Sequence, residues 1–207
     1  MNDQSYYTIE RRTQAEFKDR GSRFIGMAFP VTTVEETKQL LQEIRKQHPK
    51  ASHCCFAYRL GIDGQLFRAN DDGEPSGSAG KPILGQIDSR ELTDVLLVVV
   101  RYFGGTLLGI PGLIHAYKNT AALALQLTPR LQKTVEKQFE LRFDYTIINE
   151  VLQMTRQHQC SILEQDLQLF CRLLVGVPAG QQELFLHRLR EIKNLECMPV
   201  AKLSGAR

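Results

Sequence analysis

One long apolar stretch constrains the fold of this chain more than any other feature. Thr93 to Tyr102 is apolar nearly throughout, which predicts a central strand covered on both faces. Two adjacent glycines follow in a short turn, and Pro111 stands where a first helical residue is expected. The helix predicted from Gly112 to Leu127 is apolar on most sides, so we expect it to be buried.

The rest of the first half predicts a mixed α/β domain. Thr33 and Glu36 form a capping box, which starts an amphipathic helix that ends near Pro49. The polar, glycine-rich segment Asp71 to Pro82 is expected to be a loop. Alternation and turn residues predict four further strands, at Tyr6–Phe17, Arg23–Pro30, His53–Leu60 and Gln65–Ala69.

The second half follows a cleaner pattern of alternating strands and helices. Its predicted order is βαββαβ, which is a ferredoxin-like arrangement. A hairpin turn is expected around Gln165 and Asp166, and Asn149 is expected to cap the first helix. Polarity rises between Arg130 and Lys137, so we predict an α+β protein with two domains, residues 1–132 and 133–207.

Composition excludes several classes of protein. The 207 residues carry a net charge of only +3, and neither half is basic enough for charge alone to indicate nucleic-acid binding. No apolar run reaches the length of a membrane span, and the polar N-terminus lacks a signal peptide's apolar core. Five cysteines without C-x-x-C spacing indicate reduced thiols rather than a disulfide framework. We therefore expect a cytoplasmic protein.

The first candidate site is the turn RYFGGTLLGIPGL. Gly104 and Gly105 permit a close approach of a ligand or another backbone, and the following helix start offers free N–H groups to an anion. Arg101 can add a charged fork for phosphate or carboxylate. The simpler interpretation is a tight turn in which Arg101 pairs with an acidic neighbour.

The second candidate is the loop DDGEPSGSAGKP. Asp71, Asp72 and Glu74 are ligands of the kind that hard cations prefer, but the spacing of a calcium loop is absent. The loop's serines and glycines can also surround a phosphate, with Lys81 as the counter-charge. Its length and density of special residues favour a functional loop over a solvated turn.

Two weaker candidates remain. In HCCFAYR, strand alternation places His53 and Cys55 on one face, as a nucleophile and base or half a metal site would need. Residues of this kind more often belong to a core or its rim. Arg20 and Arg23 lie in a basic turn that is either solvated or part of a phosphate-contacting surface.

These stretches together resemble the IMPACT/YigZ family. The matching pieces, in order, are RGSRF, H-x-C-x-A-Y, DDGEPSGSAGKP, VVVRYFGG and LLG-x-x-GL-x-x-AY, and they cover most of residues 17–117. This chain departs from the family pattern at Ile110-Pro111-Gly112, and at His115, where relatives often carry lysine. If that lysine contacts a phosphate, the contribution of His115 depends on its protonation.

The resemblance implies a first domain with the left-handed βαβ fold of a small-subunit ribosomal protein and of an elongation-factor domain. That handedness breaks the usual crossover rule. The second domain is similar to the next domain of the same elongation factor. The eukaryotic relative regulates the amino-acid starvation response, and no catalytic activity defines the family. We expect no cofactor and no metal.

Three functions follow as hypotheses. The first is a non-enzymatic regulator that binds the ribosome, RNA or a ribosome-associated protein through Arg20, Arg23, Lys81, Arg101 and the glycine-turn amides. The second is a small-molecule or nucleotide-binding enzyme that uses the same loops. The third is a protein-interaction module whose loops serve packing alone.

Overall fold

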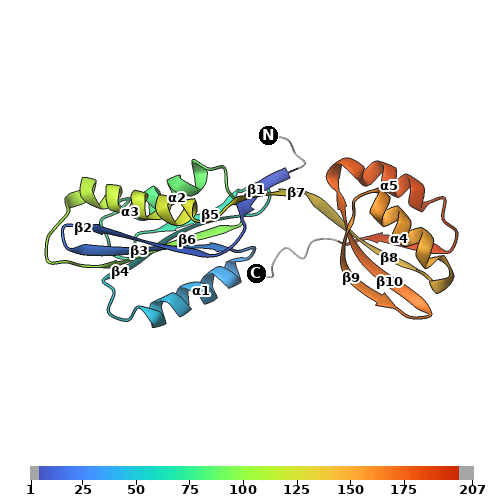
Figure 1. The fold of residues 1–207 in the computed structure, drawn as a ribbon, viewed down its shortest axis with the longest axis horizontal. Helices are drawn as coiled ribbons and strands as arrows, with labels where there is room; N and C mark the ends of the chain where they lie inside the picture. The colour runs from blue at the N-terminus through green and yellow to red at the C-terminus, as the bar shows by residue number, and fades with distance from the viewer. Residues whose placement is uncertain (1–4, 201–207) are drawn as a thin grey trace. The chain divides into compact units, whose positions relative to one another are not determined.

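The computed structural model describes residues 5–200, which form two compact units (Figure 1). One unit comprises Tyr6–Lys133, and the other comprises the described residues from Thr134 onward together with Ser5. Helices and strands are present in both, and the predicted α+β class with two domains is confirmed. No helix within residues 5–200 has the length and apolar character that crossing a membrane requires.

The first unit is built on a five-stranded sheet with the order β2-β3-β6-β4-β5. The predicted apolar strand is β6, and its position between β3 and β4 explains why seven of its eight residues are buried. A separate two-stranded sheet pairs β1 with β7. The elements of this unit are β1 (Ser5–Ile9), β2 (Thr13–Asp19), β3 (Ser22–Pro30), α1 (Val34–Gln47), β4 (His53–Leu60), β5 (Leu66–Asn70), α2 (Gly80–Asp88), β6 (Val95–Tyr102), α3 (Gly109–Gln126) and β7 (Arg130–Thr134).

Helices cover both faces of this sheet. The α1 helix packs on one face, and α2 and α3 pack together on the other (Figure 1). Side chains alternate between the two faces: Val95, Leu97 and Val99 of β6 face α2 and α3, whereas Leu96 and Val98 face α1. The capping box predicted at Thr33 is present and starts α1 at Val34.

The topology contains one left-handed crossover. The β3-α1-β4 and β5-α2-β6 units each join two parallel strands, because all neighbours in the sheet are antiparallel. The strands β3 and β4 run one way and the connection moves one way across the sheet, whereas for β5 and β6 both directions are reversed. A half-turn about the normal of the sheet therefore superimposes the two strand pairs, yet their helices lie on opposite faces. One of them is therefore right-handed and the other left-handed, which agrees with the βαβ fold that the family resemblance implied.

Three predictions for the first half were wrong in detail. The strand predicted at Tyr6–Phe17 is two strands in different sheets, because backbone N–H groups of Glu10 and Arg11 bond to the segment 128–129 and turn the chain. The loop predicted to Pro82 ends earlier, since α2 begins at Gly80, and the α2 helix itself was missed. Helix α3 begins two residues before Pro111 and exposes part of its outer face.

The second unit is a four-stranded antiparallel sheet with the order β11-β8-β10-β9, which confirms the ferredoxin-like βαββαβ arrangement. Its core lies between one face of this sheet and the helices α4 and α5. The elements are β8 (Glu136–Asp144), a short 3-10 turn (Tyr145–Ile147), α4 (Ile148–Gln157), β9 (Ser161–Leu167), β10 (Phe170–Pro178), a second 3-10 turn (Ala179–Gln181), α5 (Gln182–Leu189) and β11 (Leu195–Pro199).

Two local predictions for this unit were also wrong. Gln165 and Asp166 belong to β9 and pair with β10, so the hairpin turns at residues 168–169 instead. Asn149 does not cap α4, which begins at Ile148 directly after the 3-10 turn. The side chain of Asp144 caps that turn by accepting a hydrogen bond from the Thr146 N–H.

Candidate functional site

The register of three strands places a row of polar and aromatic side chains under α3. Arg101 of β6 lies opposite Phe24 of β3 on one side and His53 of β4 on the other. All three lie on the sheet face that α2 and α3 cover, because this face takes alternate residues of each strand. The candidate site is therefore built by strand pairing between segments far apart in the sequence.

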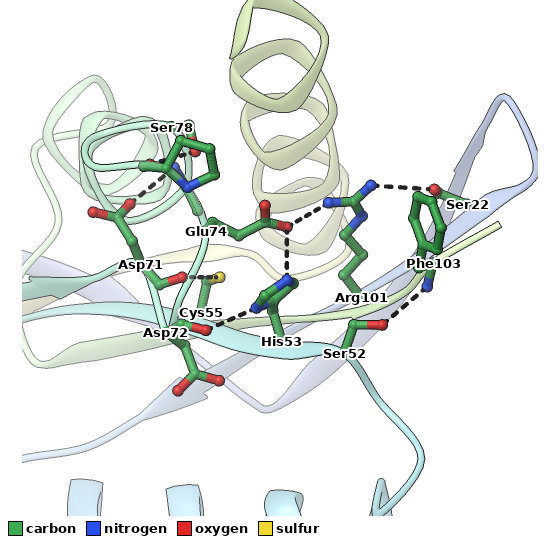
Figure 2. Close-up of polar contacts among 12 residues, drawn as sticks. Ser22, Ser52, His53, Cys55, Asp71, Asp72, Glu74, Ser78, Arg101 and Phe103 are labelled. Atoms are coloured by element: carbon green, nitrogen blue, oxygen red, sulfur yellow. Dashed lines mark hydrogen bonds and ion pairs between the residues drawn. The ribbon is translucent and has the colours of Figure 1, made fainter. Parts of the chain in front are cut away.

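The carboxylate of Glu74 is the centre of this site (Figure 2). Its Oε1 lies 2.6 Å from Nη1 of Arg101 and accepts a hydrogen bond of 2.8 Å from the Tyr117 hydroxyl. Nε2 of His53 lies 3.8 Å from the same oxygen. Glu74 and Arg101 are 8% and 5% exposed, so this is a buried ion pair that ties the loop after β5 to the central strand.

The guanidinium of Arg101 is enclosed on several sides. Its Nη2 lies 3.4 Å from Oγ of Ser22, and it packs 5.5 Å from the ring centroids of both Phe24 and Phe103. Among the buried side-chain nitrogens and oxygens of the described residues, Nε of Arg101 is the one without a hydrogen-bond partner. The contact with Glu74 matches the simpler of the two interpretations of Arg101.

Asp71 occupies the anion position at the start of α2. Its carboxylate accepts backbone hydrogen bonds from Gly77, Ala79 and Gly80 at 2.8–3.0 Å. Although burial alone would raise it, these N–H donors hold the pKa of Asp71 below its usual value. Ala79, the residue at the cap position, has no side chain that can do this. The loop thus supplies its own anion to the N–H groups that a phosphate would need.

Asp72 and His53 fasten the same loop to the sheet. Asp72 adopts a positive φ of 44°, and its carboxylate accepts a 2.7 Å hydrogen bond from the Cys54 N–H and pairs with Arg45 of α1. Nδ1 of His53 lies 2.8 Å from the carbonyl oxygen of Asp72, so this nitrogen acts as the donor. The loop is consequently anchored at both of its aspartates.

Cys55 is buried and points toward the site. Its Sγ lies 3.1 Å from the carbonyl oxygen of Asp71 and 3.4 Å from the Tyr117 hydroxyl. Burial is the main cause of the raised pKa of the Cys55 thiol, and it also raises the pKa of Tyr117. A nucleophilic cysteine needs the opposite shift.

The glycine turn is held against the β2–β3 turn. A Cβ on Gly104 would lie 1.9 Å from the backbone carbon of Gly21, so no larger residue fits there without moving the chain. Oγ of Ser22 lies 3.3 Å from the Gly104 nitrogen and accepts its N–H. Gly105 has a φ of 86° and open space around it. The two adjacent glycines therefore have different roles, close packing for the first and backbone conformation for the second.

The remaining predicted site residues lie outside this cluster. Arg20 is exposed at the β2–β3 turn, and Arg23 pairs with Glu16 at 2.7 Å. Lys81 is exposed in the first turn of α2, and His115 is exposed on α3, where its ring packs against that of Phe17. The structure brings together Glu74, Arg101, His53 and the two aspartates, and it leaves the other cations dispersed.

Two members of the site were missed in the sequence. Tyr117 is fully buried in α3, six residues beyond Pro111, and Ser22 is fully buried at the start of β3. Both lie inside pieces that match the family, so a tyrosine in a largely apolar predicted helix was an available signal for a polar partner inside the domain.

No metal site is evident in the described part of the chain: residues 5–200 contain no group of three or more histidine, cysteine, aspartate or glutamate side chains placed to hold an ion. A hollow of about 140 Å³ lies beside the site, lined by residues that include Arg45, His48, His53 and Asp72. This volume is below the roughly 300 Å³ at which small-molecule pockets begin.

Comparisons with known proteins point to one family. Residues 20–125 match the family model described as the Impact N-terminal domain. The chain is 37% identical to the IMPACT family member YvyE of Bacillus subtilis over 160 residues, which are 77% of this chain and 74% of that protein. It is 36% identical to the IMPACT family member YigZ of Escherichia coli over 172 residues, or 82% of this chain and 84% of that protein.

A solved structure described as that of a hypothetical protein covers 96% of this chain and 98% of its own, with 31% identity and a TM-score of 0.73. The fold and site thus define a two-unit α+β protein with a buried Glu–Arg–Tyr network at the end of its first sheet. This chain belongs to the IMPACT family, as its motifs indicated.

Proposed function

We propose that this protein is a non-catalytic regulator of translation, and that loops of its first unit bind the ribosome, an RNA or a ribosome-associated protein. The translational role is proposed from the family. The motif resemblance implies a eukaryotic relative that regulates the starvation response. Fold similarity by itself would not support a function.

The observation that carries the binding role is that the polar groups of the site face one another. The Glu74 carboxylate accepts hydrogen bonds from Arg101 and Tyr117, and the Asp71 carboxylate accepts hydrogen bonds from three backbone N–H groups. A catalytic group must be able to reach a substrate atom. These residues instead form an internal scaffold, and we propose that it holds the neighbouring loops in a shape that a partner recognises.

The cations that remain for a partner are the exposed ones. Arg20 at the β2–β3 turn and Lys81 at the start of α2 are both exposed. Arg101 is only 5% exposed, so we propose that it supports the surface from beneath rather than contacting phosphate. Phosphate contacts, if a nucleic acid is the partner, then come from few side chains, and the predicted salt dependence is modest.

Co-sedimentation of the full-length protein with purified ribosomes, at low and at raised salt, tests this function. We expect sedimentation at low salt, a severalfold loss with Arg20→Ala or Lys81→Ala, and no change with Lys46→Ala, an exposed cation of α1 on the other sheet face. Nuclease treatment of the ribosomes separates RNA from protein contacts. Absence of sedimentation at every salt concentration would exclude a ribosomal partner.

A small-molecule enzyme is the alternative function. At the loops of the first unit, the observation that favours it is the hollow beside His53, where Arg45 and Asp72 are already paired with each other. A thermal-shift screen with nucleotides and sugar phosphates measures this directly, because a ligand that binds the folded state raises the Tm. We expect no shift; a reproducible shift that Arg45→Ala removes would support the enzyme instead.

A further inference from the structure

The segment that joins β6 to α3, together with the first turns of α3, exposes a group of large apolar side chains. Phe103, Leu107, Ile110 and Ile114 are 48%, 83%, 54% and 39% exposed. Leu108 and Leu113 of the same segment are buried in the core, so this stretch is apolar both inside and outside. Exposed apolar residues that gather in one segment mark interaction surfaces more often than scattered single ones do.

Helical spacing places two of these side chains side by side, and a third comes just before the helix. Ile110 and Ile114 are four residues apart on α3 and lie on one face. Leu107 precedes the helix and is followed by its cap residue, Leu108. We call Phe103, Leu107, Ile110 and Ile114 the outer apolar patch.

One end of the patch is held by hydrogen bonds and close packing. Its first residue, Phe103, donates its N–H to Oγ of Ser52 at 3.3 Å, and the Arg101 guanidinium packs against its ring. The next residue, Gly104, is pressed against Gly21. Arg101 is in turn held by Glu74. A surface that is already ordered loses little conformational entropy on binding, which favours affinity.

Two exposed cations, Lys118 and Arg20, lie near the ends of the patch. The sequence contains no aspartate or glutamate from residue 95 to residue 135. Lys118, exposed and four residues beyond Ile114, extends the same stripe of α3 and has no ion-pair partner among the described residues. At the other end, Arg20 precedes Gly21, which touches Gly104, and Arg20 forms a long ion pair of 4.0 Å with the neighbouring Asp19.

We propose that the outer apolar patch is the docking surface for an acidic amphipathic helix of a partner protein. Apolar residues of that helix at i, i+3 or i+4, and i+7 cover Leu107, Ile110 and Ile114. Acidic residues at its edges meet Lys118 and Arg20. The proposal rests on the proposed function and deepens it, because it names the chemistry of the partner at this end of the first unit.

The patch is poorly suited to RNA. Single-stranded RNA is recognised by stacking on aromatic rings within a dense set of cations. This patch contains one aromatic ring, that of Phe103, beside three aliphatic side chains, and the whole chain has a net charge of only +3. Aliphatic side chains gain most when another apolar surface covers them, which a protein helix provides and a phosphate backbone does not.

Fluorescence anisotropy with the full-length protein tests the proposal. The probe is a labelled peptide of about 18 residues with leucines at helical i, i+3, i+4 and i+7 spacing and glutamates elsewhere. Its controls are the same peptide with lysines for glutamates and a single-stranded RNA of about the same length. The variants are Leu107→Gln, Ile110→Gln and the matched control Leu66→Gln, an exposed leucine of β5.

We expect the acidic peptide to bind more tightly than the lysine peptide and the RNA, and each of Leu107→Gln and Ile110→Gln to weaken it about tenfold. Leu66→Gln should leave it unchanged. Because all three side chains are exposed, the variants should fold, which the Tm confirms. No binding of the acidic peptide, equal binding of both peptides, or an RNA complex that Leu107→Gln abolishes would each overturn the proposal.

Ribosome sedimentation separates this outcome from the proposed function. If Leu107→Gln sediments with ribosomes as the wild type does and the acidic peptide fails to bind, the docking proposal is wrong and the proposed function stands. If the peptide binds in the expected pattern and sedimentation fails at every salt concentration, the docking proposal stands and the ribosomal partner is excluded.

Discussion

Nη1 of Arg101 and Oε1 of Glu74 lie 2.6 Å apart in the interior of the first unit, although the two residues come from a strand and a loop 27 positions apart. Their charges cancel in a place where water has little access. Two consequences follow: the pair fixes the position of the loop after β5, and removing either partner leaves a buried charge without its counter-charge.

The first prediction concerns this pair. Arg101→Met should destabilise the first unit by about 3–5 kcal/mol, because the Glu74 carboxylate stays buried without its cation. Glu74→Gln should cost less in the Arg101→Met background than in the wild type, since the two residues act together. Chemical denaturation of the four proteins of this double-mutant cycle measures the coupling.

Lys38→Met is the matched control for the pair. Lys38 lies 3.8 Å from Glu35 on the exposed surface of α1, and such pairs contribute well under about 1 kcal/mol. Equal losses for Lys38→Met and Arg101→Met, or strictly additive values in the cycle, would show that the buried pair contributes no more than a surface pair.

The second prediction concerns the hydroxyl of Tyr117. Tyr117→Phe keeps the ring that packs edge-on against Phe24 but removes the donor to Glu74. We expect a loss of about 1–2 kcal/mol in the free energy of unfolding, smaller than that for Arg101→Met, because Arg101 still satisfies the carboxylate. An unchanged free energy of unfolding would mean that the hydroxyl contributes nothing to stability.

The third prediction concerns Gly104. Gly104→Ala places a methyl group against the backbone of Gly21, so the turn must shift and the first unit should lose at least about 2 kcal/mol. Gly85→Ala is the control: it lies within α2 with no atom near its added Cβ, and it should be neutral or stabilise by about 0.5–1 kcal/mol. Similar Tm changes for the two variants would contradict the close approach of the turns.

The fourth prediction concerns Asp71 and acid. The pKa of Asp71 is lowered in the folded protein, so its contribution is fully present above its unfolded value of about 3.8 and is lost as the pH falls through the folded value. Asp71→Asn should cost about 1 kcal/mol at neutral pH, through weaker capping of α2. The difference between the two proteins should shrink below about pH 4, as unfolding curves across pH can show.

The fifth prediction concerns the adjacent cysteines. Burial raises the pKa of Cys54 to about 11 and that of Cys55 further. Only the thiolate reacts with alkylating reagents, so both should be alkylated slowly at pH 8 in the folded protein and rapidly in denaturant. Fast modification of Cys55 in the folded state, measured by mass spectrometry of its peptide, would reopen a nucleophilic function.

Much of the fold could be predicted from the sequence because local patterns carry it. The apolar run of β6, the capping box at Thr33 and the alternation in the second unit all predicted elements that the structure contains. The predictions that were wrong concern segments whose local pattern is overridden by hydrogen bonds to residues elsewhere in the chain. The strand predicted at Tyr6–Phe17 is divided because the N–H groups of Glu10 and Arg11 form hydrogen bonds to residues 128–129. The α2 helix was missed because the side chain that caps it, Asp71, lies eight residues before the cap position.

The candidate site shows the same division. The motifs identified Asp71, Glu74, His53 and Arg101 as special, since polar residues stood out among glycines or at the end of an apolar strand. The sequence did not predict the role of each of these residues. Whether Arg101 faces a phosphate or a carboxylate depends on strand register, which places it between Phe24 and His53 and beneath Glu74.

The sequence by itself determined the family, the α+β class and the residues that compose the site, because these depend on residue types and their local spacing. Only the tertiary structure decided that Glu74 and Arg101 neutralise each other, that Asp71 occupies its own anion site, and that Leu107 and Ile110 remain exposed. Burial and charge pairing depend on which distant segments meet, and strand pairing and helix packing alone decide that.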